Sequence, residues 1–312
     1  LFKAISPGLE GNRSIYALNL RYSTMTGCGP ALAGVLKANP FLRQLDMQFT
    51  VGWGPGDLQQ IVEAMTVNTA VENFYFFHAR EQWNSRTKNE PPALGTAIGA
   101  MLTANQHLKA LSIQCKLDLA NLTPIRQGLN ANTSLLTLDL GSIAGTENSA
   151  GTTDAVDAIN ELFATNSRLA LVTLRPPGNA ENNDVTVGIR GLERNRSVHT
   201  LVLEDADSVD GLKRLLNGNP RITHLTLKNY LRNSVSYHAM AEILEEIALA
   251  IEGNTTLLEF EFKHDDIDLL KDPRVIAALA RFEDLTERNY QLYEERRAQQ
   301  QRVRAPAAGI GL

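Results

Sequence analysis

A pattern of apolar and polar residues twelve positions long recurs nine times along the chain, as apolar-x-x-Asn-x-x-apolar-x-x-apolar-x-apolar. The position three residues before the asparagine is apolar in every copy, from Leu9 to Ile251. A unit that cannot bury its own apolar side chains must stack on copies of itself, so the pattern predicts a repeat solenoid with an extended binding surface. The repeat asparagines are Asn12, Asn39, Asn68, Asn105, Asn132, Asn166, Asn195, Asn219 and Asn254.

The residues around each asparagine predict a helix followed by a short strand. Residues 135–140 alternate between apolar and polar toward their end, as in a strand buried on one face. Helical stretches such as residues 30–38 and 155–165 precede the asparagine, which is expected just past the helix end in the left-handed conformation that Asn tolerates. Helical crossovers join parallel strands. The predicted fold is therefore an α/β solenoid with a parallel sheet on the concave side and helices on the convex side.

Proline positions predict where some helices begin. Gly29–Pro30, Thr123–Pro124 and Asp272–Pro273 each place a capping or small residue before a proline, which is favoured in the first helical turn. From Asp272 to Val303 we expect one or two capping helices, with these residues facing the last repeat: Val275, Ile276, Leu279, Phe282 and Leu285. The predicted organisation is a repeat domain at 1–271, capping helices at 272–303 and a tail or linker at 304–312.

The repeat register resembles that of leucine-rich-repeat proteins of the ribonuclease-inhibitor-like class, whose relatives include NOD-like receptor repeat domains, RanGAP and tropomodulin. The resemblance covers roughly residues 1–270. It implies a curved α/β solenoid with a parallel sheet inside and helices outside. One position departs from the class, which usually has Asn or Cys three residues after the last strand leucine. The chain has Ser23, Thr50, Ala79, Lys116, Ile143, Pro177, Ala206, Tyr230 and Asp265 there, which predicts irregular loops after the strands.

A second resemblance concerns the end of the chain. Residues 254–264 (NTTLLEFEFKH) and 289–297 (NYQLYEERR) are similar to the last repeat and terminal helix of tropomodulin and leiomodin. This resemblance implies an actin-regulatory function. Convergence is the alternative, because any terminal repeat must close its solenoid with an amphipathic cap.

Net charge and cysteine content limit the partners and the cellular compartment that are expected for the chain. A net charge of −5 favours neither nucleic acid nor insertion into an anionic membrane. Cys28 and Cys115 lie three repeats apart and cannot form a disulfide framework, so an intracellular, cytoplasmic setting is expected. The chain begins at Leu1, part-way into a repeat, and is expected to be part of a longer protein whose flanks hold any targeting signal. Four Asn-x-Ser/Thr sequons coincide with repeat asparagines, which favours a structural reason for them over glycosylation.

No catalytic or metal-binding motif is evident. Residues 52–56 (GWGPG) lack the Lys of a phosphate-binding loop, and His238 with Glu242 lacks a third metal ligand. Asp265, Asp266 and Asp268 lack the Gly and distant Glu of a calcium-binding loop. We therefore predict a non-enzymatic protein without cofactor or metal.

The most promising surface is the predicted concave face. Residues between the last two apolar positions of each strand, and those directly after it, are expected to point there. The predicted partner-binding residues are Arg21, Tyr22, Asp46, Phe49, Tyr75, Phe77, His78, Asp139 and Arg175. Aromatic residues and Arg surrounded by polar groups are typical of binding hot spots. The alternative is that some of these rings pack beneath loops or against an N-terminal cap.

Together these features predict a monomeric protein-recognition array within a larger receptor, adaptor or effector. Two alternatives stay open: an actin-regulatory domain, and the substrate-recognition region of an enzyme whose catalytic part lies outside this chain. The long spacings at 78–93, 141–153 and 229–239 predict surface loops, of which the first is a candidate contact arm.

Overall fold

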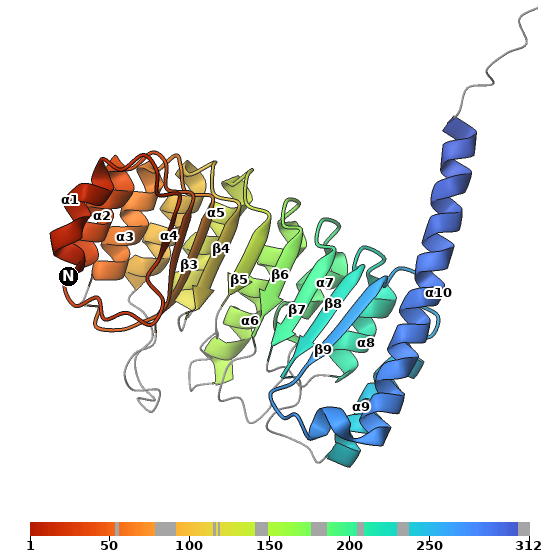
Figure 1. Cartoon of the computed structure of the whole chain (residues 1–312). Helices are drawn as coiled ribbons and strands as arrows, with labels where there is room; N and C mark the ends of the chain where they lie inside the picture. Colours follow the sequence, from red (N-terminus) through yellow and green to blue (C-terminus); the bar gives the residue numbers. More distant parts are fainter. Residues whose placement is uncertain are drawn as a thin grey trace, which may run out of the picture. The chain divides into compact units, whose positions relative to one another are not determined.

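The computed structural model describes residues 1–53, 56–78, 92–114, 117, 119–140, 149–175, 186–204, 209–229 and 237–304. The chain divides into two compact units, Leu1–Val198 (unit 1) and His199–Leu312 (unit 2). Each unit alternates parallel strands with helices (Figure 1), so the predicted α/β repeat architecture is confirmed.

Unit 1 contains a parallel sheet whose strands follow one another in sequence order. Its strands are β1 (Ala17–Asn19), β2 (Gln44–Thr50), β3 (Asn73–His78), β4 (Ala110–Gln114), β5 (Thr137–Leu140) and β6 (Leu171–Leu174). Its helices are α1 (Phe2–Glu10), α2 (Gly29–Ala38), α3 (Asp57–Val67), α4 (Pro92–Ala104), α5 (Leu119–Ala131), α6 (Ser149–Thr165) and α7 (Thr186–Arg194).

Unit 2 repeats this pattern and ends in a long helix. Its strands β7 (Thr200–Glu204), β8 (His224–Lys228) and β9 (Glu259–Lys263) pair in parallel and in sequence order. Its helices are α8 (Val209–Gly218), α9 (Tyr237–Ala250), the short 3-10 helix η1 (Leu269–Lys271) and α10 (Pro273–Arg304).

The core of unit 1 is built from the predicted apolar positions. Leu45, Phe74, Leu111, Leu138 and Val172 pair in register on successive strands, and all are 0% exposed. The helices α2 to α5 lie on one side of this sheet (Figure 1). The period-two alternation of each strand therefore buries one face against the helices, as the sequence predicts.

The repeat asparagines connect neighbouring repeats. The amide nitrogen of Asn132 donates to the backbone oxygens of Leu102 and Asn105, at 2.7 and 2.9 Å. Its amide oxygen accepts from the backbone nitrogens of Ser134 and Leu135. The same two donations are made by Asn39, Asn105 and Asn195, and one of them is made by Asn68, Asn166 and Asn254. We call this set of side chains the asparagine ladder.

The ladder corrects the predicted reason for these asparagines. Asn39 and Asn68 end α2 and α3 with φ of −93° and −76°, so they are extended and not left-handed. Asparagine is needed there because one short side chain must both donate to the preceding repeat and accept from its own turn.

The same geometry accounts for the recurring sequons. The hydroxyls of Ser197 and Thr256 donate to the amide oxygen of the asparagine two residues earlier, at 3.2 and 3.3 Å, while the hydroxyl of Ser134 donates to the backbone oxygen of Leu108 in the preceding repeat at 2.8 Å. A small hydroxyl residue is therefore favoured at this position by the turn itself. This supports the structural interpretation of the sequons.

The predicted helix starts are partly correct. Helix α2 begins at Gly29 with Pro30 in its first turn, and α10 begins at Pro273. The start predicted at Thr123–Pro124 is wrong, because α5 begins at Leu119 and has Pro124 inside it. The extra turn is stabilised by Asn121, which is 0% exposed and accepts a hydrogen bond from the backbone nitrogen of Gly95 in α4.

Helix α10 covers the end of unit 2. Val275, Ala278 and Phe282 are buried, and the Phe282 ring stacks on Phe260 of β9 with centroids 3.8 Å apart. The prediction that Ile276 faces the last repeat is wrong, since its side chain is 52% exposed. It lies one residue beyond Val275 and therefore on a different side of the helix.

Arg288 and Asn289 of α10 complete the ladder of unit 2. Asn289 donates to the backbone oxygen of Leu257 at 2.8 Å. The Arg288 guanidinium donates to the backbone oxygens of Glu252 and Asn254, at 2.8 and 2.6 Å. The bond from Arg288 to Asn254 takes the place of the one that the asparagine of a further repeat would make.

Candidate protein-binding surface

The strand register of unit 1 brings the predicted face residues into one row. The row lies on the side of the sheet opposite the buried apolar residues and the helices (Figure 1), which we call the helix-free face. Its members, in register from β1 to β6, are Asn19, Asp46, Tyr75, Ser112, Asp139 and Thr173. The predicted residues Asp46, Tyr75 and Asp139 therefore share this row.

A bulge at the end of β2 turns Phe49 into an unusual conformation. The pairing of β2 with β3 shifts between Met47 and Thr50, and Phe49 has φ of 58°. Tyr22, two residues after the buried Leu20 that directly follows β1, also has φ of 58°. Because both backbones take the same turn, the two rings stack with centroids 5.0 Å apart and planes 3° apart.

Arg21 lies beside these two rings. Its guanidinium carbon is 5.8 Å from the Tyr22 centroid and 5.6 Å from the Phe49 centroid, within cation–π range. Its Nε is 3.8 Å from a carboxylate oxygen of Asp46. The Tyr22 side chain is 75% exposed, so the stack is presented to solvent. We call Arg21, Tyr22 and Phe49 the aromatic platform.

Tyr75 lies on the strand next to Asp46. Burial raises the pKa of its phenol, and the Asp46 carboxylate raises it further. Like an unshifted tyrosine, Tyr75 is a neutral hydrogen-bonding group at physiological pH. Phe77 and His78 belong to β3, but their side chains fall outside the described part of the chain. Of the predicted site, the structure brings together Arg21, Tyr22, Asp46 and Phe49, with Tyr75 one strand away.

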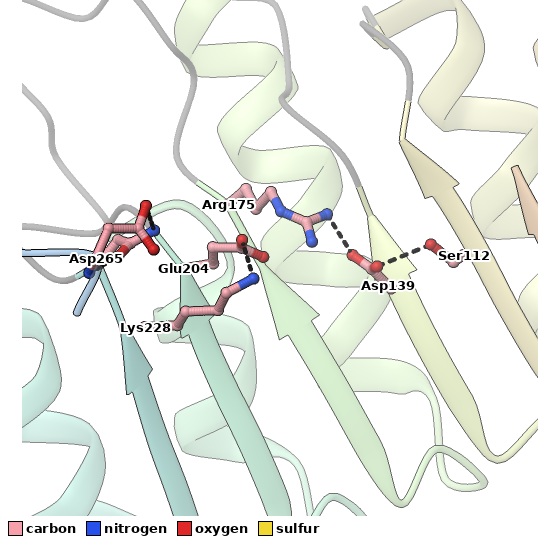
Figure 2. A network of polar contacts seen from close by, with 7 residues as sticks. Ser112, Asp139, Arg175, Glu204, Lys228 and Asp265 are labelled. Atoms are coloured by element: carbon pink, nitrogen blue, oxygen red, sulfur yellow. Dashed lines mark hydrogen bonds and ion pairs between the residues drawn. The ribbon is translucent and has the colours of Figure 1, made fainter. Parts of the chain in front are cut away.

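Asp139 and Arg175 form a second cluster in unit 1 (Figure 2). The Asp139 carboxylate accepts a hydrogen bond from the Ser112 hydroxyl and one from the Arg175 guanidinium, each at 2.8 Å. The Asp139 and Arg175 side chains are 15% and 19% exposed. Ser112 was not among the predicted binding residues, although its register opposite Asp139 is the signal for this contact.

Unit 2 has polar pairs at the same ends of its strands (Figure 2). Lys228 donates to Glu204 at 2.6 Å, and these two residues are paired in register on β8 and β7. Asn229 has φ of 48° and its side chain makes two contacts with Asp265, one to the carboxylate and one to the backbone nitrogen. The prediction omitted these residues, although opposite charges in register indicate the first pair.

Asn229 shows what the fold itself requires at the platform position. Like Tyr22 and Phe49, it follows the last buried strand residue by two positions and has a positive φ. Asn is one of the few residues that tolerate this region, whereas aromatic residues are strained there. The scaffold alone therefore gives no reason for the two rings.

Metal and membrane sites are not indicated by the described residues. Among them, no three His, Cys, Asp or Glu side chains are grouped so as to hold a metal ion. In the same part of the chain, no helix is both long and apolar enough to span a membrane. The candidate contact arm at 78–93 lies almost entirely outside the described residues, as does most of 229–239. Cys28 is buried and unpaired, and Cys115 is not described.

Comparison with known proteins gives structural likenesses only. No protein-family model and no curated protein matches the chain. A solved structure of the leiomodin-1 actin-binding site 2 is 13% identical and covers 97% of this chain and 96% of its own, with a TM-score of 0.29. The tropomodulin C-terminal domain of Caenorhabditis elegans is 18% identical and covers 65% of this chain and 98% of its own, with a TM-score of 0.30. These values assign the chain to no family.

Proposed function

We propose that the chain is a non-enzymatic recognition module that binds a protein partner on the helix-free face of unit 1. One observation carries this proposal: an exposed Tyr22 ring stacks on Phe49 in a backbone conformation that disfavours both side chains. A left-handed conformation costs about 1 kcal/mol for each non-glycine residue. An exposed ring recovers little of that cost by burial, so binding is the better explanation.

The composition of the surface agrees with this function. Tyr and Arg are enriched at the energetic centres of protein interfaces, where they combine apolar contact with hydrogen bonding. The row beside the platform supplies the polar groups Asp46, Tyr75 and Asp139. Contacts with Ser112 and Arg175 hold the Asp139 carboxylate in one orientation, so this part of the face is ordered before a partner arrives.

We place this module in a larger receptor, adaptor or effector that acts inside the cell as a monomeric repeat array of the ribonuclease-inhibitor-like class. The low cysteine count supports the intracellular setting. A role in choosing substrates for an enzyme encoded elsewhere in a longer chain stays a prediction.

The test is quantitative capture of partners from a cell lysate by three folded forms of the chain. The first is the native chain and the second carries Tyr22→Asn and Phe49→Asn. The third carries Ile5→Asn and Val67→Asn, which remove exposed apolar side chains from α1 and α3. We expect a partner that the native chain and the helix variant retain equally and the platform variant loses. Equal retention by all three forms would show that the face is not the binding site.

An actin-regulatory function is the second candidate. It is supported by the resemblance of residues 254–264 and 289–297 to the end of tropomodulin and leiomodin. These two segments contact each other in unit 2, where the side-chain amide of Asn289 donates to the backbone oxygen of Leu257 at 2.8 Å. Sedimentation of the chain with actin filaments, and titration of the chain with monomeric actin, test this candidate directly. Absence of binding in both assays would eliminate it.

A further inference from the structure

The terminal nitrogens of Arg21 distinguish it from Arg175 of the same surface and from Arg288 of α10. Arg175 donates to Asp139 and Arg288 donates to two backbone oxygens. Arg21 contacts Asp46 only through Nε at 3.8 Å, which is too long for a hydrogen bond. Within the described residues, its two terminal nitrogens have no hydrogen-bond acceptor. The side chain is 38% exposed and lies beside two rings that fix its position.

A carboxylate is the group that matches these donors. The planar guanidinium binds a carboxylate through two parallel hydrogen bonds, and a preformed geometry reduces the loss of side-chain entropy. A cationic ligand is disfavoured because Arg21 already lies within 6 Å of both ring centroids. Asp46 does not change this preference, since its side chain is only 11% exposed and also accepts from the backbone nitrogen of Gln48.

The exposed ring of Tyr22 favours a ligand that also carries an aromatic ring. Phe49 stacks against Tyr22 with the two planes 3° apart, and 75% of the Tyr22 residue is exposed. A third ring extends such an offset stack and adds contact area without displacing any group of the protein. A short segment that presents a ring and a carboxylate to the same side therefore contacts Tyr22 and Arg21 together.

We propose that the aromatic platform binds a segment of a protein partner that carries an aromatic side chain beside an acidic one. This inference rests on the proposed function and names the chemistry of its partner. A nucleotide also combines a ring with an anion. It is the less favoured ligand because channels that bind a nucleic-acid strand carry a run of basic groups along the phosphate backbone, whereas the aromatic platform contains one basic residue, Arg21.

Synthetic peptides test the proposal on the full chain. The probe is acetyl-Gly-Glu-Phe-Glu-Gly-amide, and its controls replace either both Glu by Gln or the Phe by Ala. Binding is followed by NMR at low salt through the backbone amide signals of Arg21, Tyr22 and Phe49. We expect the acidic aromatic peptide to bind about tenfold more tightly than either control, because each change removes one of two contacts. Equal binding of the Gln peptide, or no saturable shift with any peptide, would overturn the proposal.

Variants of the chain test the contact of Arg21 with a carboxylate and the contact of Tyr22 with a ring separately. Arg21→Gln should abolish the preference for the Glu peptide over the Gln peptide while leaving the preference for Phe over Ala. Arg168→Gln is the matched control, since Arg168 is an exposed arginine outside the platform, and it should leave both preferences unchanged. The Tyr22→Asn, Phe49→Asn variant should lose the preference for Phe, and its fold is protected because Asn229 occupies the same backbone conformation. If Arg21→Gln keeps the preference for Glu, or the Tyr22→Asn, Phe49→Asn variant keeps the preference for Phe, the proposed contacts are wrong.

A thymidine decanucleotide completes the set of probes. Tighter binding of this strand than of the acidic aromatic peptide, with shifts at the same amides, would replace the peptide proposal by a nucleic-acid one. If no peptide binds but capture from lysate still depends on the platform, this inference fails and the proposed function stands. If the peptide binds but capture does not depend on the platform, the proposed function fails instead.

Discussion

The side-chain amide nitrogen of Asn132 donates a 2.9 Å hydrogen bond to the backbone oxygen of Asn105, the corresponding asparagine of the preceding repeat. Asn105 makes the same contact with Asn68 at 2.9 Å. Each asparagine thus binds the turn of the repeat before it while its own turn is bound by the repeat after it. The contact is buried, since Asn132 is 4% exposed and Asn105 is 2% exposed. The ladder therefore couples the stability of neighbouring repeats.

Asn132→Asp should destabilise unit 1 by about 3 kcal/mol, because the change removes two buried donors and puts a carboxylate against two carbonyl oxygens. Asn12→Asp is the matched control. Asn12 accepts from Ser14 and Ile15 like the other repeat asparagines, but within the described residues its amide nitrogen donates to no acceptor. Denaturant unfolding measures both variants, and equal effects would show that the donations to the preceding repeat contribute nothing.

Gly99→Ala should destabilise the packing of α4 against α5. A methyl group on Gly99 would overlap the backbone oxygen of Pro124, and backbone cannot move aside as a side chain can. The expected loss is about 1–3 kcal/mol. Gly8→Ala in α1 meets no atom within 4 Å and should gain up to about 1 kcal/mol from helix propensity. Thermal unfolding of both variants tests this pair, and a loss of the same size in both would exclude overlap as the cause.

Arg288→Met should loosen α10 by about 1–2 kcal/mol, since it leaves the carbonyl oxygens of Glu252 and Asn254 without these donors. Hydrogen exchange should accelerate in α10 and at the end of α9, and not in α8. Arg296→Met is the control, because Arg296 is exposed and its side chain makes no hydrogen bond or ion pair with other described residues. Unchanged exchange in Arg288→Met would show that the cap is held by Phe282 and its apolar neighbours alone.

The Asp272 carboxyl should titrate well below the ordinary range. The Arg274 side chain donates to it, and the backbone nitrogen of Arg274 donates as well, which together lower its pKa to about 2. A lowered pKa means that the carboxylate stabilises the start of α10 above the usual Asp pKa of 3.8, and that this contribution is lost as the pH falls through about 2. Carboxyl NMR measures the value. Arg274→Gln should raise it, and an unshifted pKa in the native chain would contradict the hydrogen bonds.

The buried positions could be predicted from the sequence, while the reason for the asparagines could not. Leu138 and Leu111 follow from period-two alternation within single strands, which is a local signal. The role of Asn132 depends on backbone oxygens 27 and 30 residues earlier, whose positions are set only when the repeats stack. The tendency of asparagine to end helices predicts a left-handed conformation, whereas Asn39 and Asn68 are extended in the structure.

The sequence predicted the residues of the aromatic platform as binding residues, but it did not predict their backbone conformation or their stacking. Tyr22 and Phe49 were expected on adjacent repeats from their shared offset after the strand. Both residues have a positive φ and their rings are parallel, and at Phe49 this conformation coincides with a shift in register between β2 and β3, which exists only once the strands pair. The start of α5 was missed for a similar reason, because a buried contact of Asn121 with Gly95 extends the helix beyond the proline signal.

Hydrogen exchange of the chain with and without its captured partner tests the central claim most directly. Recognition through the helix-free face predicts that the partner slows exchange at residues 20–24 and 47–51, which flank Tyr22 and Phe49, and at the ends of β3 to β5. The exposed sides of α2, α3 and α5 should exchange at unchanged rates. Protection confined to those helices, or to α10, would contradict the account.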